Sequence, residues 1–348
     1  MSIINAYNSQ KIKIGIAGVG HLGRRHALQL KQAPEAELVG VFDVNRDRAE
    51  AIAREFGAPV FDNFARLLQK IAAICIVTPT TTHFELARQA LLAGRHVFVE
   101  KPFVETPAQA AELIRLKNER NLNLQVGHIE RFNPAIMALE PLKINPLFIE
   151  AHRMANFDPR GTDVAVVMDL MIHDIDLILS FVKSPVKSVD ASGVSVISPN
   201  EDIANCRLLF ENGCVANVTA SRISVKKMRK MRFFQPDSYI SVDFLTGISE
   251  LYRIDSRDDF QLPQNSLAFS LGKIEKGLET KEIRYTRLKK TDINPLRHEL
   301  RLFCQSIVSN TTPPVTAEDG YRALRVAQLI LNSIDEHTKL VKNHWQLR

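Results

Sequence analysis

Hydrophobic residues in the first third of the chain follow two alternating patterns. Short apolar runs rich in Val, Ile and Ala alternate with longer stretches in which apolar residues recur every three or four positions. The short runs predict buried strands, and the longer stretches predict amphipathic helices. Strands are expected at residues 13–19, 37–43, 72–79, 96–102 and 123–128, and helices at residues 21–32, 46–56, 83–94 and 107–120. Strands joined by helices of this length run parallel, so residues 1–126 are predicted to form an α/β Rossmann domain with a doubly wound parallel sheet, of which residues 1–10 are a flexible tail.

The pattern changes beyond residue 130, where longer strand-like runs dominate. They lie at residues 147–153, 206–212, 214–224, 238–245 and 249–255. Asn212-Gly213 separates two of these runs and is a strong hairpin signal. Helical spacing returns at residues 166–182, 295–308 and 316–340. Residues 127–348 are therefore predicted to form an α+β domain with an antiparallel sheet, whose C-terminal helices pack back on the first domain. Residues 256–285 lack a clear pattern, which indicates a long loop or an arm that contacts a partner.

Composition fits an ordinary globular protein with room for two domains. The chain has 348 residues, of which 45% are hydrophobic and 24% charged. These values argue against wholesale disorder and collagen-like repeats. The four cysteines lie far apart without a C-x-x-C pair, which argues against a zinc site and a disulfide framework. The sequence has no long apolar stretch and no signal peptide, so we expect a cytoplasmic protein that does not enter the membrane.

Charge adds little to this picture. The net charge of +6 is spread over the whole chain, and a mild excess of this kind helps to attract anionic ligands. The one dense basic stretch, residues 222–232, is interpreted as a solvated strand face. Nucleic acid is therefore not expected as a partner.

A glycine-rich motif follows the first predicted strand and precedes the first helix. In G-x-G-x-x-G, Gly18 permits a tight turn, Gly20 lets the backbone approach a pyrophosphate, and Gly23 lets helix and strand pack closely. Asp43 ends the next strand, where its carboxylate can accept hydrogen bonds from ribose hydroxyls and repel a 2′-phosphate. NAD is therefore predicted rather than NADP, although Arg46 lies near enough to weaken that preference. The expected cofactor contacts in this region are Gly18, Gly20, His21, Leu22, Gly23 and Asp43.

Two further motifs end predicted strands at the same edge of the sheet. Thr78-Pro79-Thr80 and His83 follow the third strand and are either cofactor contacts or a helix cap. Glu100-Lys101-Pro102 ends the fourth strand, where a lysine would lie beside the nicotinamide. The alternative for Lys101 is a merely solvated side chain.

A carboxylate and an imidazole occur four residues apart in the helical segment 166–182. Asp169 and His173 would share one face of a helix, and such a pair is suited to proton transfer. The alternatives are a helix cap or a salt bridge. A metal site formed by His173, Asp174 and Asp176 is not expected, because successive helical residues face different ways.

These motifs, in this order, resemble the Gfo/Idh/MocA oxidoreductase family. The resemblance rests on the segments at residues 18–26, 77–83, 100–102 and 169–173. It implies an N-terminal nucleotide-binding domain, a C-terminal open antiparallel sheet that makes oligomer contacts in a dimer or tetramer, and a catalytic Lys and His. On this likeness Lys101 and His173 are catalytic, with Asp169 beside them, and the Lys101-Pro102 bond is cis.

Within the family, residues 127–135 and 163–180 resemble nucleotide-sugar 3-dehydrogenases acting on UDP-N-acetylglucosamine. Residues 165–167 are Ala-Val-Val, where many free-sugar dehydrogenases of the family have a glycine-rich turn. A diphosphate-bearing substrate would suit guanidinium groups, which meet phosphate oxygens bidentately. The expected substrate contacts are Arg131, Asn133, Arg153 and Arg160, with Arg222 as a further candidate. For each arginine taken alone, a surface or salt-bridge role is the favoured alternative, and Arg131 is the best substrate candidate.

The sequence thus predicts an NAD-dependent dehydrogenase that oxidises a secondary alcohol of a sugar, with C3 of a UDP-N-acetylglucosamine-type nucleotide sugar as the favoured position. His173 or Lys101 would take the hydroxyl proton, and sequence does not decide between them. One alternative is a free-sugar or inositol dehydrogenase of the same family. The other is a regulator that senses NAD without catalysis.

Overall fold

The computed structural model describes residues 11–158, 164–255, 267–276, 279–290 and 293–345. The chain divides into two compact units. The first comprises Met1–Ile129 and Asn294–Leu324, and the second comprises Glu130–Ile293 and Arg325–Arg348. The tail expected at residues 1–10 lies outside the described residues.

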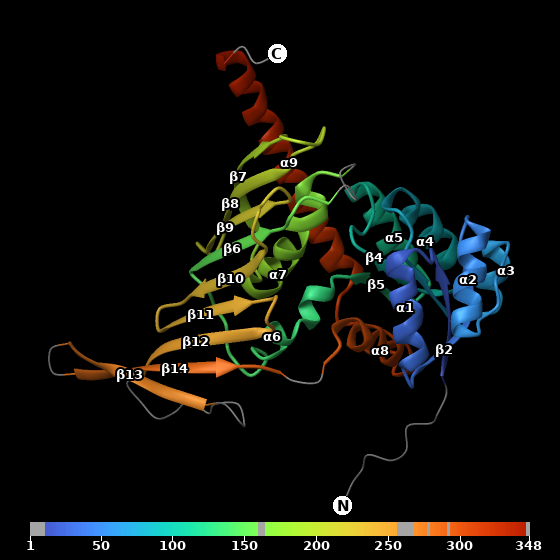
Figure 1. Ribbon diagram of the computed structural model, residues 1–348, viewed down its shortest axis with the longest axis horizontal. Coiled ribbons are helices and arrows are strands. Elements are labelled where there is room, and N and C mark those ends of the chain that lie inside the picture. Colours follow the sequence, from blue (N-terminus) through green and yellow to red (C-terminus); the bar gives the residue numbers. More distant parts are fainter. Residues whose placement is uncertain (1–10, 159–163, 256–266, 277–278, 291–292, 346–348) are drawn as a thin grey trace, which may run out of the picture. The chain divides into compact units, whose positions relative to one another are not determined.

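The first unit is built on a five-stranded parallel sheet (Figure 1). Its strands are β1 (Ile12–Ala17), β2 (Ala36–Phe42), β3 (Ala73–Ile76), β4 (His96–Glu100) and β5 (Leu124–Gly127), in the order β2-β1-β3-β4-β5. Every neighbouring pair is parallel, which confirms the predicted Rossmann sheet. The chain leaves β1 toward β2 and returns to pair β3 on the other side of β1. Ligands of open α/β sheets bind at such a switch point, beyond the carboxyl ends of the strands.

Helices cover this sheet and supply its core. They are α1 (His21–Gln32), α2 (Arg46–Phe56), α3 (Phe64–Leu68), α4 (His83–Leu92), α5 (Pro107–Glu119) and α8 (Pro295–Val308). In one cluster Ile14 and Ile16 of β1 pack with Leu30 of α1 and with Leu300 and Phe303 of α8, all fully buried. Helix α8 therefore belongs to the hydrophobic core of the first unit, although it lies far from that unit's other helices in sequence.

The second unit contains a nine-stranded sheet (Figure 1). Its strands are β6 (Phe148–Met154), β7 (Val186–Val194), β8 (Ile203–Phe210), β9 (Val215–Ser221), β10 (Met228–Phe234), β11 (Ser238–Asp243), β12 (Ile248–Asp255), β13 (Leu267–Lys276) and β14 (Glu279–Leu288). The order is β13-β14-β12-β11-β10-β6-β9-β8-β7, and only β6 and β9 pair in parallel. The predicted antiparallel sheet is confirmed. So is the hairpin at Asn212-Gly213, because Gly213 adopts φ +84° between the antiparallel strands β8 and β9.

Two local predictions in the second unit were correct only in part. Residues 267–276 and 279–288 form a strand hairpin, so the loop alternative was wrong, while the partner-contacting arm stays a prediction. Charged residues are frequent from position 273 to 287 and interrupt the apolar pattern there, and residues 256–266 lie outside the described residues. The segment expected to be one helix over 166–182 begins with a π-helical turn, Val167–Met171, before α7 (Ile172–Val182). The remaining helices are α6 (Pro134–Met137) and α9 (Ala317–Trp345).

All four cysteines are buried free thiols. Burial raises the pKa of Cys206 and of Cys304 to about 12, so both stay protonated and unreactive. Within the described ranges, no group of three or more His, Cys, Asp or Glu side chains is placed to hold a metal ion. Across the same residues, no helix has the length and apolar character needed to cross a bilayer.

Candidate active site

The backbone of the turn after β1 requires glycine at Gly18 and at Gly23. Gly18 has φ +86°, and a Cβ there would lie 2.6 Å from the Val77 carbonyl oxygen. A Cβ on Gly23 would lie 2.0 Å from the Gly18 carbonyl oxygen, so helix α1 can approach the turn only through glycine. Gly20 precedes α1 without a side chain, and His21 and Leu22 are exposed in the first turn of that helix. The turn therefore offers the N–H groups of a helix N-terminus, which favour anions.

Asp43 joins this turn to the end of β2. One carboxylate oxygen accepts the Val19 N–H at 2.8 Å, and the other accepts the Asn45 N–H at 2.8 Å. The Arg48 guanidinium lies 3.6 Å from Asp43. Arg46, the neighbour expected from sequence, instead pairs with Glu50 and Asp62 on the surface. The cation beside the candidate ribose site is therefore Arg48.

Hydrogen bonds from Thr82 and His83 hold the conformation of the loop after β3. Thr82 donates its hydroxyl proton toward the Thr78 hydroxyl at 2.7 Å or the Pro79 carbonyl at 2.8 Å. His83 is only 1% exposed. Its Nε2 lies 2.9 Å from the Thr78 carbonyl oxygen, and its Nδ1 lies 2.9 Å from the Pro102 carbonyl oxygen. His83 was expected to touch the cofactor, but its ring is occupied by backbone carbonyls and braces two loops.

The segment after β4 holds Lys101 between two buried neighbours. The Lys101-Pro102 bond is cis, as the family resemblance implied. Glu100 contacts His26 Nε2 at 2.8 Å and accepts the backbone N–H of Lys101 at 3.1 Å. Burial raises the pKa of Glu100, but the bonds from His26 and Lys101 outweigh it and bring the pKa below its usual value. Glu100 is thus an anion beside Lys101, and sequence reasoning missed its partner His26.

Asp169 and His173 lie at the start of the helical segment in the second unit. Asp169 belongs to the π-helical turn, and His173 is the second residue of α7. Both are half-buried. A π-helical turn inside a helix often marks a functional site, because it breaks the regular ladder and re-aims side chains. The turn changes the local geometry from the α-helix that the spacing predicted.

The two carboxylates that follow His173 in α7, Asp174 and Asp176, form ion pairs with arginines. Asp174 accepts two hydrogen bonds from Arg153, both at 2.8 Å. Asp176 accepts two from Arg131, at 2.7 Å and 2.6 Å. Arg153 also donates to Glu130 at 2.8 Å and is only 2% exposed. Burial raises the pKa of Asp174 even though Arg153 opposes that rise.

These contacts correct part of the expected substrate site. Arg153 is an internal cation whose guanidinium is occupied by two carboxylates, so it is not a phosphate ligand. Asn133 caps α6 and donates to Glu130 and to the Phe244 carbonyl, which gives it a structural role as well. Arg131 forms a salt bridge with Asp176, which is the alternative to substrate binding that the sequence favoured. Arg160 lies outside the described residues.

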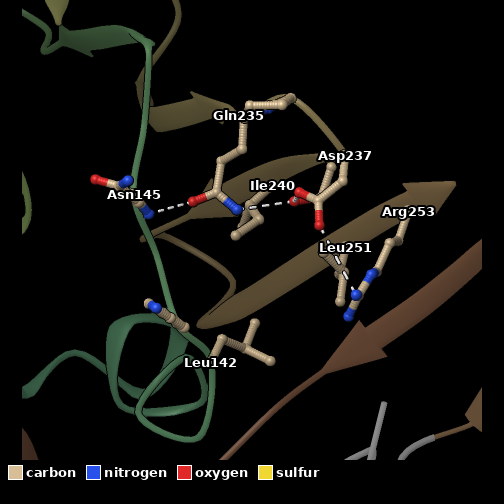
Figure 2. Close-up of a pocket in the computed structure, with 10 residues that line it drawn as sticks. Leu142, Asn145, Gln235, Asp237, Ile240, Leu251 and Arg253 are labelled. Carbon is tan, nitrogen blue, oxygen red and sulfur yellow. Dashed lines mark hydrogen bonds and ion pairs between the residues drawn. The ribbon is translucent and has the colours of Figure 1, made fainter. Parts of the chain in front are cut away.

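The second unit also has a pocket of about 560 Å³ beside the β10–β11 turn (Figure 2). Its polar groups are partly engaged with one another: Gln235 bonds to Asn145 and Ser238, and Asp237 lies 3.7 Å from Arg253. Leu142, Ile240 and Leu251 supply apolar walls. None of the residues predicted to act in catalysis or cofactor binding lines this pocket, so we do not assign the chemistry to it.

Comparison with protein families gives two matches that follow one another along the chain. Residues 12–128 match the oxidoreductase family model described as an NAD-binding Rossmann fold. Residues 149–236 match the GFO/IDH/MocA C-terminal domain. The first match contains the glycine turn, the Thr78 loop and Lys101.

Similar individual proteins agree with these matches. A UDP-N-acetylglucosamine 3-dehydrogenase from Acidithiobacillus ferrooxidans is 43% identical over 242 residues, which are 69% of this chain and 77% of that protein. Its solved structure superposes with a TM-score of 0.83 and 34% identity, covering 94% of this chain and 98% of the other. An inositol 2-dehydrogenase from Rubrobacter xylanophilus is 30% identical over 198 residues, which are 54% of this chain and 57% of that protein.

Proposed function

The chain belongs to the Gfo/Idh/MocA family of NAD-binding oxidoreductases, and from this premise we propose that it is an NAD-dependent dehydrogenase that oxidises the C3 hydroxyl of a UDP-N-acetylglucosamine-type nucleotide sugar to a ketone. The main support for the reaction class is the set of residues that follow the carboxyl ends of β1 and β4. A nucleotide turn follows the first strand, and Lys101 follows the other. The substrate class comes from the 43% identical relative that acts on this sugar.

The residues of the turn fit the cofactor. A Cβ on Gly20 would have the Arg48 guanidinium, 3.8 Å away, as its nearest neighbour, so there is open space over the turn for a pyrophosphate. Gly18, Gly20, His21, Leu22 and Gly23 would hold that group, and Asp43 would accept the ribose hydroxyls. Thr78, Pro79 and Thr80 would lie along the cofactor, as would the Glu100-Lys101-Pro102 segment. When bound, NAD supplies the ring carbon that accepts a hydride.

The chain's own residues would handle the proton. In this proposal the neutral His173 imidazole accepts the hydroxyl proton as the carbon-bound hydrogen leaves as hydride. The Lys101 ammonium donates a hydrogen bond to the same oxygen and stabilises its alkoxide character. Asp169 holds a second hydroxyl or orients the imidazole. General acid–base action of this kind contributes about 10²- to 10⁴-fold to a rate.

Turnover and binding assays together test the proposal. We expect NADH absorbance to rise when the purified chain meets NAD and UDP-N-acetylglucosamine, and NAD to raise the unfolding temperature more than NADP does. Free glucose and myo-inositol serve as matched substrates without a nucleotide. Turnover of inositol but not of UDP-sugars would favour the inositol dehydrogenase alternative, and NAD binding without turnover of any substrate would favour a sensor.

We propose that the enzyme works in the cytoplasm, where its free thiols stay reduced. We further propose that a second copy of the chain covers the open face of the nine-stranded sheet. Six aromatic side chains cross this face from strand to strand, with neighbouring ring centroids 5.1–6.5 Å apart. Their strand neighbours Phe233, Ile240 and Leu251 face the core and are buried. The six are Phe148, Phe234, Tyr239, Tyr252, Tyr285 and Phe269.

Sedimentation of the full chain tests this surface. We expect a dimer or tetramer, and we expect Tyr252→Lys to shift the distribution toward monomer by placing a charge in the middle of the aromatic row. The matched variant Lys187→Ala changes an exposed residue of β7 and should leave the mass unchanged. A monomeric wild-type chain at micromolar concentration would contradict the proposal.

A further inference from the structure

Two buried histidines flank the candidate catalytic lysine from opposite sides along the chain. His26 comes from α1 and contacts the side chain of Glu100, the residue before Lys101. His83 comes from α4 and contacts the carbonyl of Pro102, the residue after Lys101. The two imidazoles are 0% and 1% exposed, and all these residues belong to the first unit.

The contact between His26 and Glu100 holds the residue before the lysine. The atoms His26 Nε2 and Glu100 Oε1 are 2.8 Å apart, and the second oxygen of Glu100 accepts the Lys101 N–H. Gly127 closes the space around this carboxylate, because a Cβ there would lie 3.1 Å from Glu100 Oε2. Since a carboxylate only accepts, His26 must donate from Nε2. Loss of this donor would leave a buried anion short of a partner.

The contacts of His83 hold the residue after the lysine. Its two ring nitrogens face the carbonyl oxygens of Thr78 and Pro102, each at 2.9 Å. Carbonyls only accept, and a neutral imidazole has a single N–H. Burial lowers the pKa of His83 below its ordinary value, although the carbonyls and Glu100 act in the opposite direction. The neutral ring therefore donates to one carbonyl at a time.

We infer that His26 and His83 are positioning residues for Lys101, and that they act by fixing Glu100 and the Pro102 carbonyl on either side of it. This inference rests on the proposed function, in which Lys101 hydrogen-bonds the reacting oxygen. Neither histidine needs to touch substrate or cofactor. A displacement of about 1 Å at a catalytic group can cost about 10²-fold in rate, so two buried restraints on the adjoining backbone matter for turnover.

Amide side chains allow each contact to be kept or removed with the same chemistry. The Asn amide nitrogen is bonded to Cγ, as His Nδ1 is, whereas the Gln amide nitrogen lies one atom further out, as His Nε2 does. His26→Gln keeps a donor for Glu100, and His26→Asn withdraws it. His83→Asn keeps a donor for Pro102, and His83→Gln moves it toward Thr78. Each pair buries the same kind of group, so a general loss of stability cannot separate its two members.

The measurement is kcat at saturating NAD and sugar, together with the Kd for NAD. We expect His26→Gln and His83→Asn to retain kcat to within about 3-fold, and His26→Asn and His83→Gln to lose about 10- to 100-fold. His96→Asn is the matched control, since His96 lies at the other end of β4 and accepts the Asn123 N–H. It should leave kcat unchanged.

A double-mutant cycle with Lys101→Met shows whether the histidines act through the lysine. In that background His26→Asn and His83→Gln should lower kcat by less than about 2-fold, because the group that they position is gone. Equal kcat within each Asn/Gln pair, or an undiminished loss in the Lys101→Met background, would overturn the inference. Wild-type kcat in Lys101→Met itself would instead contradict the role of Lys101 in the proposed function.

Discussion

Lys101→Met is expected to lower kcat by about 10²- to 10⁴-fold while the Kd for NAD stays within about 3-fold of wild type. Methionine retains the unbranched apolar stem of the side chain but removes the ammonium donor that would stabilise alkoxide character. The nucleotide turn and Asp43 are untouched, so cofactor binding should survive. Turnover is followed by NADH absorbance with UDP-N-acetylglucosamine, and the Kd is measured by calorimetry.

His173→Asn is expected to lower kcat over the same range, because an amide cannot accept a proton at neutral pH. If only one of the two variants is impaired, that residue is required for turnover and the other is dispensable. Lys31→Met provides the matched control, since it removes one charge from an exposed position of α1. Wild-type turnover in both Lys101→Met and His173→Asn would refute the assignment of these residues.

The geometry of the glycine turn could be predicted because its constraints are local. The approach of Gly23 to the Gly18 carbonyl and the positive φ of Gly18 are set within six residues of chain, so a short motif specifies them. Asp43 lies at the end of the adjacent parallel strand, where strand pairing brings it to the turn. The fold followed from the same kind of information, namely apolar runs and helical spacing.

Side-chain partners could not be predicted, because tertiary packing chooses them. His26 meets Glu100 from 74 positions away, and Arg131 meets Asp176 from 45 positions away. A guanidinium binds carboxylate and phosphate with the same bidentate geometry, so the sequence alone left both partners open for Arg131 and Arg153. The hairpin at 267–288 was missed for a different reason: its charged residues, which are frequent from position 273 onward, are as compatible with an open sheet face as with a loop.

Arg153→Met is expected to destabilise the second unit by about 3 to 5 kcal/mol near neutral pH, the usual cost of breaking a buried ion pair from one side. The substitution leaves the carboxylates of Asp174 and Glu130 inside the protein without their shared cation. The Phe244 ring, whose centroid lies 5.6 Å from the Arg153 guanidinium carbon, also loses its cation. The measurement is the urea dependence of unfolding, followed by circular dichroism.

The pH dependence of this loss identifies its cause. Burial already raises the pKa of Asp174, and without Arg153 that pKa rises further. A carboxyl whose pKa is higher in the folded protein than in the unfolded chain binds protons preferentially when folded, so its variant gains stability as pH falls and loses it as pH rises through the folded pKa. The loss of unfolding free energy in Arg153→Met should therefore shrink between pH 8 and pH 5, and the stability of Arg153→Met combined with Asp174→Asn should be less sensitive to pH.

The control is Arg115→Met, which breaks an exposed pair with Glu119 and should lower the free energy of unfolding by less than about 1 kcal/mol. A pH-independent deficit would mean that lost packing, rather than an unpaired carboxylate, accounts for the destabilisation.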